Sequence, residues 1–122
     1  MFELQVKSHF SAAHQIRNYP GDCARVHGHN WEVIVYIQAS ELDEQGIGVD
    51  FRVVKDALQS ALGEFDHRDI NEHSAFQEIN PTSETIARYL YKKLGDELNT
   101  AQVKVTRVQV AESPGTSAAY FE

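Results

Sequence analysis

Hydrophobic and polar residues alternate along the first ten residues of the chain. One phase comprises Phe2, Leu4, Val6, Ser8 and Phe10, and the other comprises Glu3, Gln5, Lys7 and His9. A period of two residues is typical of a β-strand with one buried face. A second run, residues 30–40, is rich in β-branched and aromatic residues and predicts a second strand. The link between them, residues 11–28, is long for a small domain, and such loops are usually functional.

Two later segments have the apolar spacing of α-helices. In the first, which Asp50 can cap, the apolar positions are Phe51, Val54, Leu58, Ala61, Leu62 and Phe65. The second begins within residues 80–84, where a proline, a hydroxyl cap and an acid come together. Its apolar face comprises Ile86, Ala87, Leu90, Leu94 and Leu98. We expect both apolar stripes to face the hydrophobic core.

Two more strands are predicted near the C-terminal end, over residues 103–112 and 117–121. The valines of the first of these strands change phase between Val105 and Val108. One extra residue in a strand shifts the side chains that follow to the other phase. We therefore expect a β-bulge near residues 106–107.

The predicted order of elements is ββααββ within one domain, residues 1–122. This order favours an α+β fold, in which a four-stranded antiparallel sheet carries both helices on one face. The other face and two sheet edges are then uncovered, which favours association of several copies. We therefore expect a homo-oligomer.

Composition narrows the classes of function. The chain has 122 residues, one cysteine and a formal net charge of −7. An acidic protein is a poor general partner for nucleic acid, whose phosphate backbone attracts basic surfaces. No segment has the length and apolar character of a membrane span or a signal peptide. Since a lone cysteine forms no internal disulfide, we expect a cytoplasmic protein that binds neither nucleic acid nor membrane.

Three histidines form the strongest chemical signal. His27 and His29 flank Gly28, and side chains two residues apart on a strand point the same way. His14 lies where the first strand should end and can complete the site from the neighbouring strand. Catalytic Zn²⁺ commonly takes three protein ligands and leaves a position open. We therefore expect His14, His27 and His29 to bind Zn²⁺.

Cys23 lies in a polar loop four residues before His27. A thiol near a cation can have a lowered pKa, and the thiolate is its reactive form. Two alternatives stay open for this residue. Instead of a reactive thiol, it could be a fourth ligand in a closed structural Cys/His₃ site, or an inert small apolar residue.

Two acidic residues have further possible roles. Asp66 directly precedes His67, and a carboxylate beside an imidazole can fix its tautomer and raise its basicity. With Cys23 they would form a proton-transfer group, although His67 and Arg68 also suit a simple helix C-terminus. Glu112 ends a predicted strand, where it is either an ordinary surface charge or an anchor for a planar amidine-like group.

The chain resembles the 6-pyruvoyl- and 6-carboxy-tetrahydropterin synthase superfamily. The resemblance rests on residues 23–31 (CARVHGHNW), Asp66-His67, residues 80–84 (NPTSE) and Glu112, in this order over nearly the whole chain. Three residues separate the cysteine from the HGH motif, as in the bacterial 6-carboxy-tetrahydropterin synthases of the queuosine pathway. The resemblance implies the tunnelling fold, in which sheets join into a trimeric barrel, two trimers stack as a hexamer and active sites lie between subunits.

The same resemblance implies a role for each candidate residue. The three histidines would hold zinc, Cys23 would be the proton acceptor, and His67 with Asp66 would be its relay partner. Glu112 would anchor the pterin edge, and Thr82 and Ser83 would line the pterin pocket. Lys7, Arg17, Arg25 and Arg68 are all possible ligands of a triphosphate.

The implied substrate is 7,8-dihydroneopterin triphosphate, converted to 6-carboxy-5,6,7,8-tetrahydropterin with loss of acetaldehyde and triphosphate. Two alternatives accompany this lyase. One is a 6-pyruvoyl-tetrahydropterin synthase, which eliminates triphosphate without cleaving a carbon–carbon bond. The other is a non-catalytic interaction module stabilised by zinc.

Overall fold

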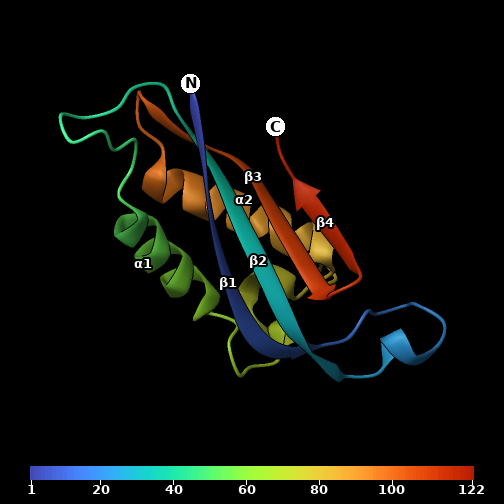
Figure 1. Ribbon diagram of the computed structural model, residues 1–122. Coiled ribbons are helices and arrows are strands. Elements are labelled where there is room, and N and C mark those ends of the chain that lie inside the picture. The colour runs from blue at the N-terminus through green and yellow to red at the C-terminus, as the bar shows by residue number, and fades with distance from the viewer.

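The computed structural model describes residues 1–122 and contains the expected ββααββ order. The strands and helices are β1 (Phe2–His14), β2 (His27–Ala39), α1 (Phe51–Leu62), α2 (Ser83–Leu98), β3 (Val103–Ser113) and β4 (Thr116–Tyr120). Three short 3₁₀ helices are η1 (Asp22–Ala24), η2 (Ile70–Glu72) and η3 (Ser74–Phe76). Figure 1 shows the long β1–β2 pair running past both helices.

The four strands form one antiparallel sheet in the order β1-β2-β3-β4. Strand β1 pairs with β2 from Phe2 opposite Ala39 to His14 opposite His27. Both strands are longer than predicted, so the link between them is residues 15–26 rather than 11–28. The buried phase of β1 continues through Ala12 and His14, a small residue and a polar one, which a search for large apolar side chains misses.

The predicted bulge lies in β3. Tyr36 is opposite Arg107 and Ile37 is opposite Val105, so Thr106 is the extra residue. The bulge lets valines on both sides of Thr106 face the helices. Because Val110 then lies in the buried phase, the next residue of that phase, Glu112, is on the helix side of the sheet.

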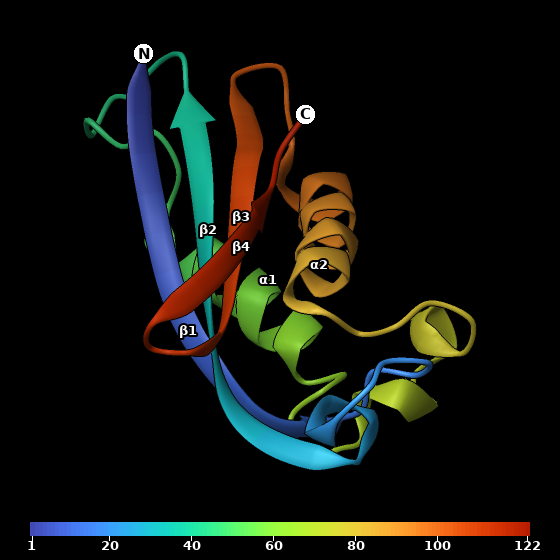
Figure 2. The ribbon, with the colours of Figure 1, turned by 90° about the vertical axis from the view of Figure 1, so that its right-hand side faces the viewer.

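Both helices cover the same face of the sheet (Figure 2), as predicted. The Asp50 carboxylate caps α1 by accepting from the Arg52 backbone N–H. The predicted stripe of α1 is buried except for Phe51, whose half-exposed ring corrects that expectation. Phe51 is the first residue of α1, and because helical side chains lean toward the N-terminus, its ring extends past the end of the helix. Phe65 is fully buried beyond the end of α1 at Leu62.

Helix α2 begins with a reciprocal cap. The Thr82 hydroxyl accepts from the Thr85 backbone N–H, and the Thr85 hydroxyl accepts from the Thr82 backbone N–H. The predicted apolar face of α2 is buried in full. Pro81 therefore precedes the cap instead of opening the helix, and its carbonyl group is free to contact another part of the chain.

The sheet face opposite the helices is mainly polar and has no covering element (Figure 2). The segment Asp66–Asp69 runs along the outer edge of β1 and forms a bridge there between Ala13 and Asp69. The edge of β4 is uncovered. No helix has the length and apolar character that crossing a membrane would require.

Candidate active site

Three histidine rings converge at one end of the sheet. His14 ends β1, and His27 and His29 begin β2, opposite His14 and Ala12 respectively. All three side chains are on the helix side of the sheet, and their candidate ligand atoms lie within 4.8 Å of one another. The ring centroids are 4.6 Å apart for His14 and His27, 5.3 Å for His14 and His29, and 4.9 Å for His27 and His29. The predicted group of three imidazoles is therefore formed within a single chain.

Backbone carbonyl groups orient two of the rings. His14 Nδ1 donates to the Pro81 carbonyl at 2.7 Å, and His27 Nδ1 donates to the Arg25 carbonyl at 2.7 Å. A carbonyl oxygen can only accept, so these contacts place the proton on Nδ1 and leave the Nε2 lone pair free. His14 Nε2 is buried and has no hydrogen-bond partner. A metal ion can use such a buried, unpaired lone pair.

The charge state of His14 suits the same ligand. Burial lowers the pKa of His14, and the neighbouring His27 lowers it further, against the opposing effect of the Pro81 hydrogen bond. The imidazole is therefore neutral near pH 7, which is the form that binds a metal. Three imidazole nitrogens are a donor set typical of catalytic zinc sites.

Glu112 lies beside the histidines. Its Oε2 atom is 3.4 Å from His14 Nε2 and 3.6 Å from His29 Nε2. Val108 and Val110, on the same face of β3, are fully buried, whereas the Glu112 side chain is 37% exposed. The carboxylate accepts no hydrogen bond from a backbone or non-histidine group of the chain, so it is available to a ligand that enters the site.

Cys23 lies in η1, within the loop that joins β1 to β2, and its side chain is half-buried. The thiol is not a member of the group formed by the histidines. The histidine group is complete without Cys23, which favours an open three-histidine site over a closed Cys/His₃ site. The backbone carbonyl of Cys23 accepts from the Ile16 N–H at 2.8 Å, which ties η1 to the residues that follow His14.

Asp66 and His67 form the predicted local pair. Asp66 Oδ1 is 3.0 Å from His67 Nδ1 and also accepts from the Ser11 backbone N–H at 3.0 Å. The Ser11 hydrogen bond, more than the contact with His67, lowers the pKa of Asp66. The carboxylate is therefore ionised, as a group that orients an imidazole must be.

The His67 ring lies outside the histidine site of its own chain. Its side chain is 82% exposed, and no hydrogen bond or ion pair links it to Cys23. The backbone of His67 is left-handed, with a φ of 59°, and its N–H donates to the Ser11 carbonyl at 2.6 Å. Since α1 ends at Leu62, His67 does not lie in the last turn of that helix. The backbone holds this pair at the sheet edge, directed toward solvent.

The structure also places the residues of weaker predictions. The Thr82 hydroxyl is used in the cap of α2, and Ser83 is half-buried at the start of that helix. The Arg17 guanidinium donates to the Phe76 carbonyl at 2.7 Å, and Lys7 pairs with Glu32 on the open face of the sheet. Arg17 and Lys7 are thus engaged within the chain, whereas Arg25 and Arg68 are exposed and form no ion pair.

Sequence reasoning did not find the groups that hold this site in place. One is the Pro81 carbonyl, which accepts from the His14 ring. The others are the side chains of Asn71 and Asn80, which form hydrogen bonds with the backbone of the loop between β1 and β2. Asn80 and Pro81 belong to the NPTSE motif, which predicted only a helix start and carried part of the resemblance. Nothing in the local pattern marks Asn71.

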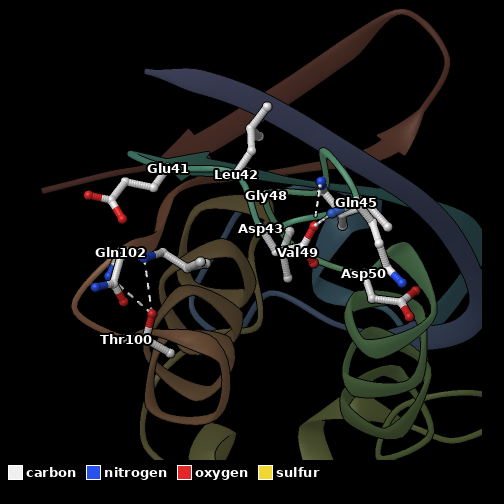
Figure 3. A pocket seen from close by; sticks show the side chains of 11 residues that line it. Glu41, Leu42, Asp43, Gln45, Gly48, Val49, Asp50, Thr100 and Gln102 are labelled. Atoms are coloured by element: carbon white, nitrogen blue, oxygen red, sulfur yellow. Dashed lines mark hydrogen bonds between the residues drawn. The ribbon is translucent and has the colours of Figure 1, made fainter.

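A hollow of about 360 Å³ lies at the opposite end of the sheet (Figure 3). It is formed by residues 41–50, after the end of β2, and by residues 100–103, before and at the start of β3. The Asp43 carboxylate points to its own loop, where Oδ1 accepts from the backbone N–H groups of Gln45 and Ile47. This carboxylate stabilises a turn, and none of the predicted site residues lines the hollow.

The sequence is similar to known proteins over its whole length. A model of the family described as 6-pyruvoyl tetrahydropterin synthase matches residues 3–122. A 6-carboxy-5,6,7,8-tetrahydropterin synthase from Bacillus subtilis (strain 168) is 37% identical, over 98% of this chain and 84% of its own. A protein of the same name from Synechocystis sp. is 32% identical, over 92% of this chain and 87% of its own.

The fold is also similar to solved structures. The structure of Caenorhabditis elegans 6-pyruvoyl tetrahydropterin synthase superimposes with a TM-score of 0.88, covering 99% of this chain and 95% of that one at 24% identity. The Plasmodium vivax 6-pyruvoyltetrahydropterin synthase gives a TM-score of 0.76 at 20% identity. At these identities the likeness concerns the fold, and the predicted α+β architecture is confirmed.

Proposed function

Since the chain belongs to the 6-pyruvoyl tetrahydropterin synthase family, we propose that it is a zinc-dependent lyase acting on 7,8-dihydroneopterin triphosphate. The products are 6-carboxy-5,6,7,8-tetrahydropterin, acetaldehyde and triphosphate, in queuosine (7-deazaguanine) biosynthesis. The family resemblance drawn from the motifs is confirmed. The observation that carries the proposal is the convergence of His14, His27 and His29 beside the Glu112 carboxylate.

His14, His27 and His29 would hold the zinc ion through their Nε2 atoms. When bound, zinc supplies a Lewis acid that polarises and acidifies the hydroxyl groups of the substrate side chain. The carbonyl groups of Pro81 and Arg25 keep two of the donors, His14 and His27, oriented for the metal.

Cys23 would act as the base that takes protons from the activated side-chain carbons. It lies in the loop between the strands that carry the ligands, outside the ligand group, which leaves its sulfur free for proton transfer. A thiolate near a bound cation is stabilised, and proton transfer by a positioned side chain contributes about 10²- to 10⁴-fold in rate.

We propose that His67 and Asp66 serve the Cys23 of a neighbouring subunit. The pair is preformed, and its segment covers the outer edge of β1 at residues 11–13. The His67 side chain is 82% exposed there, so another copy can reach it. Asp66 would fix the tautomer of His67, which would carry the proton between thiol and solvent. We therefore propose a homo-oligomer, trimer or hexamer, with active sites between subunits, as the family resemblance implies.

Glu112 would anchor the pterin through its 2-amino and N3 groups, because an ionised carboxylate accepts two parallel hydrogen bonds from such an edge. Thr82 and Ser83, next to the Pro81 carbonyl that orients His14, would line the pterin pocket. Of the four cations suggested for the triphosphate, Arg25 and Arg68 are the two that are exposed and form no ion pair. We place the enzyme in the cytoplasm, where a single reduced thiol persists.

A 6-pyruvoyl synthase is the second candidate, because the fold superimposes well on solved proteins of that name. The relatives at 32–37% identity and the three-residue spacing between Cys23 and His27 favour the carboxy-forming reaction instead. The reaction products distinguish the two candidates directly, because only the carboxy-forming reaction releases acetaldehyde.

The deciding experiment is incubation of the zinc-loaded protein with 7,8-dihydroneopterin triphosphate, with mass spectrometry of the pterin and trapping of the aldehyde. We expect equal amounts of the 6-carboxy product and acetaldehyde. A 6-pyruvoyl product without acetaldehyde would establish the second candidate. An unchanged substrate would refute the enzymatic proposal and leave the zinc-stabilised interaction module.

A further inference from the structure

Two asparagine side chains pair with the backbone at the start of the β1–β2 loop. Asn71 Oδ1 accepts from the Gln15 N–H at 2.8 Å, and Asn71 Nδ2 donates to the Gln15 carbonyl at 3.1 Å. Asn80 pairs in the same way with Arg17, which lies two residues after Gln15. It accepts from the Arg17 N–H at 2.9 Å and donates to the Arg17 carbonyl at 3.0 Å. Each amide therefore satisfies a backbone donor and acceptor that a neighbouring strand would otherwise satisfy.

The residue between these two pairs holds the Cys23 loop. Ile16 donates its backbone N–H to the Cys23 carbonyl at 2.8 Å. In an extended segment, backbone groups of successive residues point to opposite sides. Gln15 and Arg17 therefore bond to the asparagines on one side, while Ile16 bonds to η1 on the other. A shift of this segment must move Cys23 with it.

The Arg17 guanidinium fastens the same junction. It donates to the Phe76 carbonyl at 2.7 Å and to the Asn71 carbonyl at 3.5 Å. Asn71 lies in η2, directly after the segment that carries Asp66 and His67. Asn80 directly precedes Pro81, whose carbonyl orients His14. The two amides thus connect the thiol loop to the elements that hold the other functional groups.

We infer that Asn71 and Asn80 are positioning residues that set the place of the Cys23 thiol relative to the histidine site. Neither touches the ligand group, and each acts through the backbone of residues 15–17. Asn71 is 8% exposed with both ends of its amide used, which is the state expected of a fixed internal support. The inference rests on the proposed role of Cys23 as the base.

The effect on turnover follows from geometry. A misplacement of about 1 Å in a reacting group can cost on the order of 100-fold in rate. A loop released from its two supports also exposes its half-buried thiol more often to reagents in solution. Loss of either amide should therefore lower kcat more than it changes KM, and should make Cys23 react faster with iodoacetamide.

The test uses the zinc-loaded full chain with the variants Asn80→Ala, Asn80→Asp and Asn71→Asp. Asn80→Asp retains the acceptor for the Arg17 N–H and loses the donor, so it provides a milder change if Asn80→Ala does not fold. Asn99→Ala is the matched control, because Asn99 Oδ1 accepts from the Val105 backbone N–H at 2.7 Å at the far end of α2. Zinc content, the alkylation rate of Cys23, kcat and KM are measured for each.

We expect about tenfold or greater loss of kcat and at least threefold faster alkylation in the Asn80 and Asn71 variants. Zinc should stay at one ion per chain, and the control should match the parent protein. An increase of less than about threefold in the alkylation rate of Cys23 would overturn the inference. So would an equal increase in Asn99→Ala. Alkylation needs no turnover, so this result stands apart from the product assay: an inactive parent protein refutes the proposed function, and unchanged alkylation refutes the positioning role.

Discussion

His14 and Pro81 are joined by a hydrogen bond between the imidazole Nδ1 and the backbone carbonyl, 2.7 Å apart, although they lie 67 residues from each other in the chain. This contact links the end of β1 to the residue before the α2 cap. It determines which nitrogen of His14 carries the proton. The other nitrogen, Nε2, is thereby left unprotonated, and it is buried without a hydrogen-bond partner.

Replacement of His14 by alanine should abolish zinc binding and activity together. Loss of a ligand should weaken zinc by more than about 100-fold, since even an outer hydrogen-bond partner is worth about 10- to 100-fold. Metal analysis after dialysis measures the effect. His9→Ala is the control, because His9 is exposed on the other face of β1. Full zinc content in His14→Ala would remove His14 from the ligand set.

Cys23→Ala should retain zinc, fold and substrate affinity while turnover falls by about 10²- to 10⁴-fold. The reason is that the thiol is outside the ligand group and would act only in proton transfer. Metal analysis, circular dichroism and single-turnover kinetics check the three parts of this expectation. Loss of zinc in this variant would show that the thiol is a ligand after all.

Mixed oligomers should report whether the site lies between subunits. Cys23→Ala and His67→Ala should each be inactive alone. If chains mix at random in equal amounts, about one quarter of the interfaces regain an intact pair, and the activity should return to about that fraction. Activity is compared before and after the two variants are unfolded and refolded together. No recovery, with normal oligomers by size-exclusion chromatography, would place the pair and the thiol in separate functions.

Glu112→Gln should mainly weaken pterin binding. The carboxylate forms charge-assisted hydrogen bonds that a neutral amide cannot reproduce in both positions, which predicts about 10- to 100-fold lower affinity. Pterin affinity is measured by fluorescence titration, with zinc content determined on the same samples. An unchanged affinity would refute the anchor role of Glu112.

Glu64 should make stability depend on pH. Partial burial opposes its ionisation, but hydrogen bonds from Lys93, Tyr89 and His73 lower the pKa of Glu64 to about 2 from an ordinary 4.5. The ionised carboxylate therefore favours the folded state in full above about pH 4.5, and this contribution is lost as the pH falls toward about 2.

Glu64→Gln tests this dependence. Allowing for the 28% exposure of the side chain, we expect the free energy of unfolding at about pH 7 to fall by about 2 kcal/mol. The difference from the parent protein should shrink below about pH 4.5 in urea unfolding curves. Glu3→Gln is the control, because Glu3 is exposed on β1 and forms no ion pair. A difference that stays constant with pH would contradict the assigned network.

The local pattern of the sequence was sufficient for the elements and for part of the site. Alternation and helical spacing predicted four strands, two helices and the bulge at Thr106, because these depend on neighbours within a few residues. The strand period placed His27 and His29 on one face for the same reason. The pattern failed at Phe51, because spacing alone does not say whether the first residue of a helix reaches the core; Val54, one turn later in α1, is fully buried.

Tertiary structure decided what joins distant parts of the chain. It brought His14 to the pair on β2, set the Pro81 carbonyl against its ring, placed Glu112 beside both, and supported residues 15–17 with Asn71 and Asn80. It also separated His67 from the Cys23 of the same chain. Periodicity reports which face a side chain occupies, whereas a contact across 50 or more residues depends on how the packed elements meet, and that information is not local to any segment.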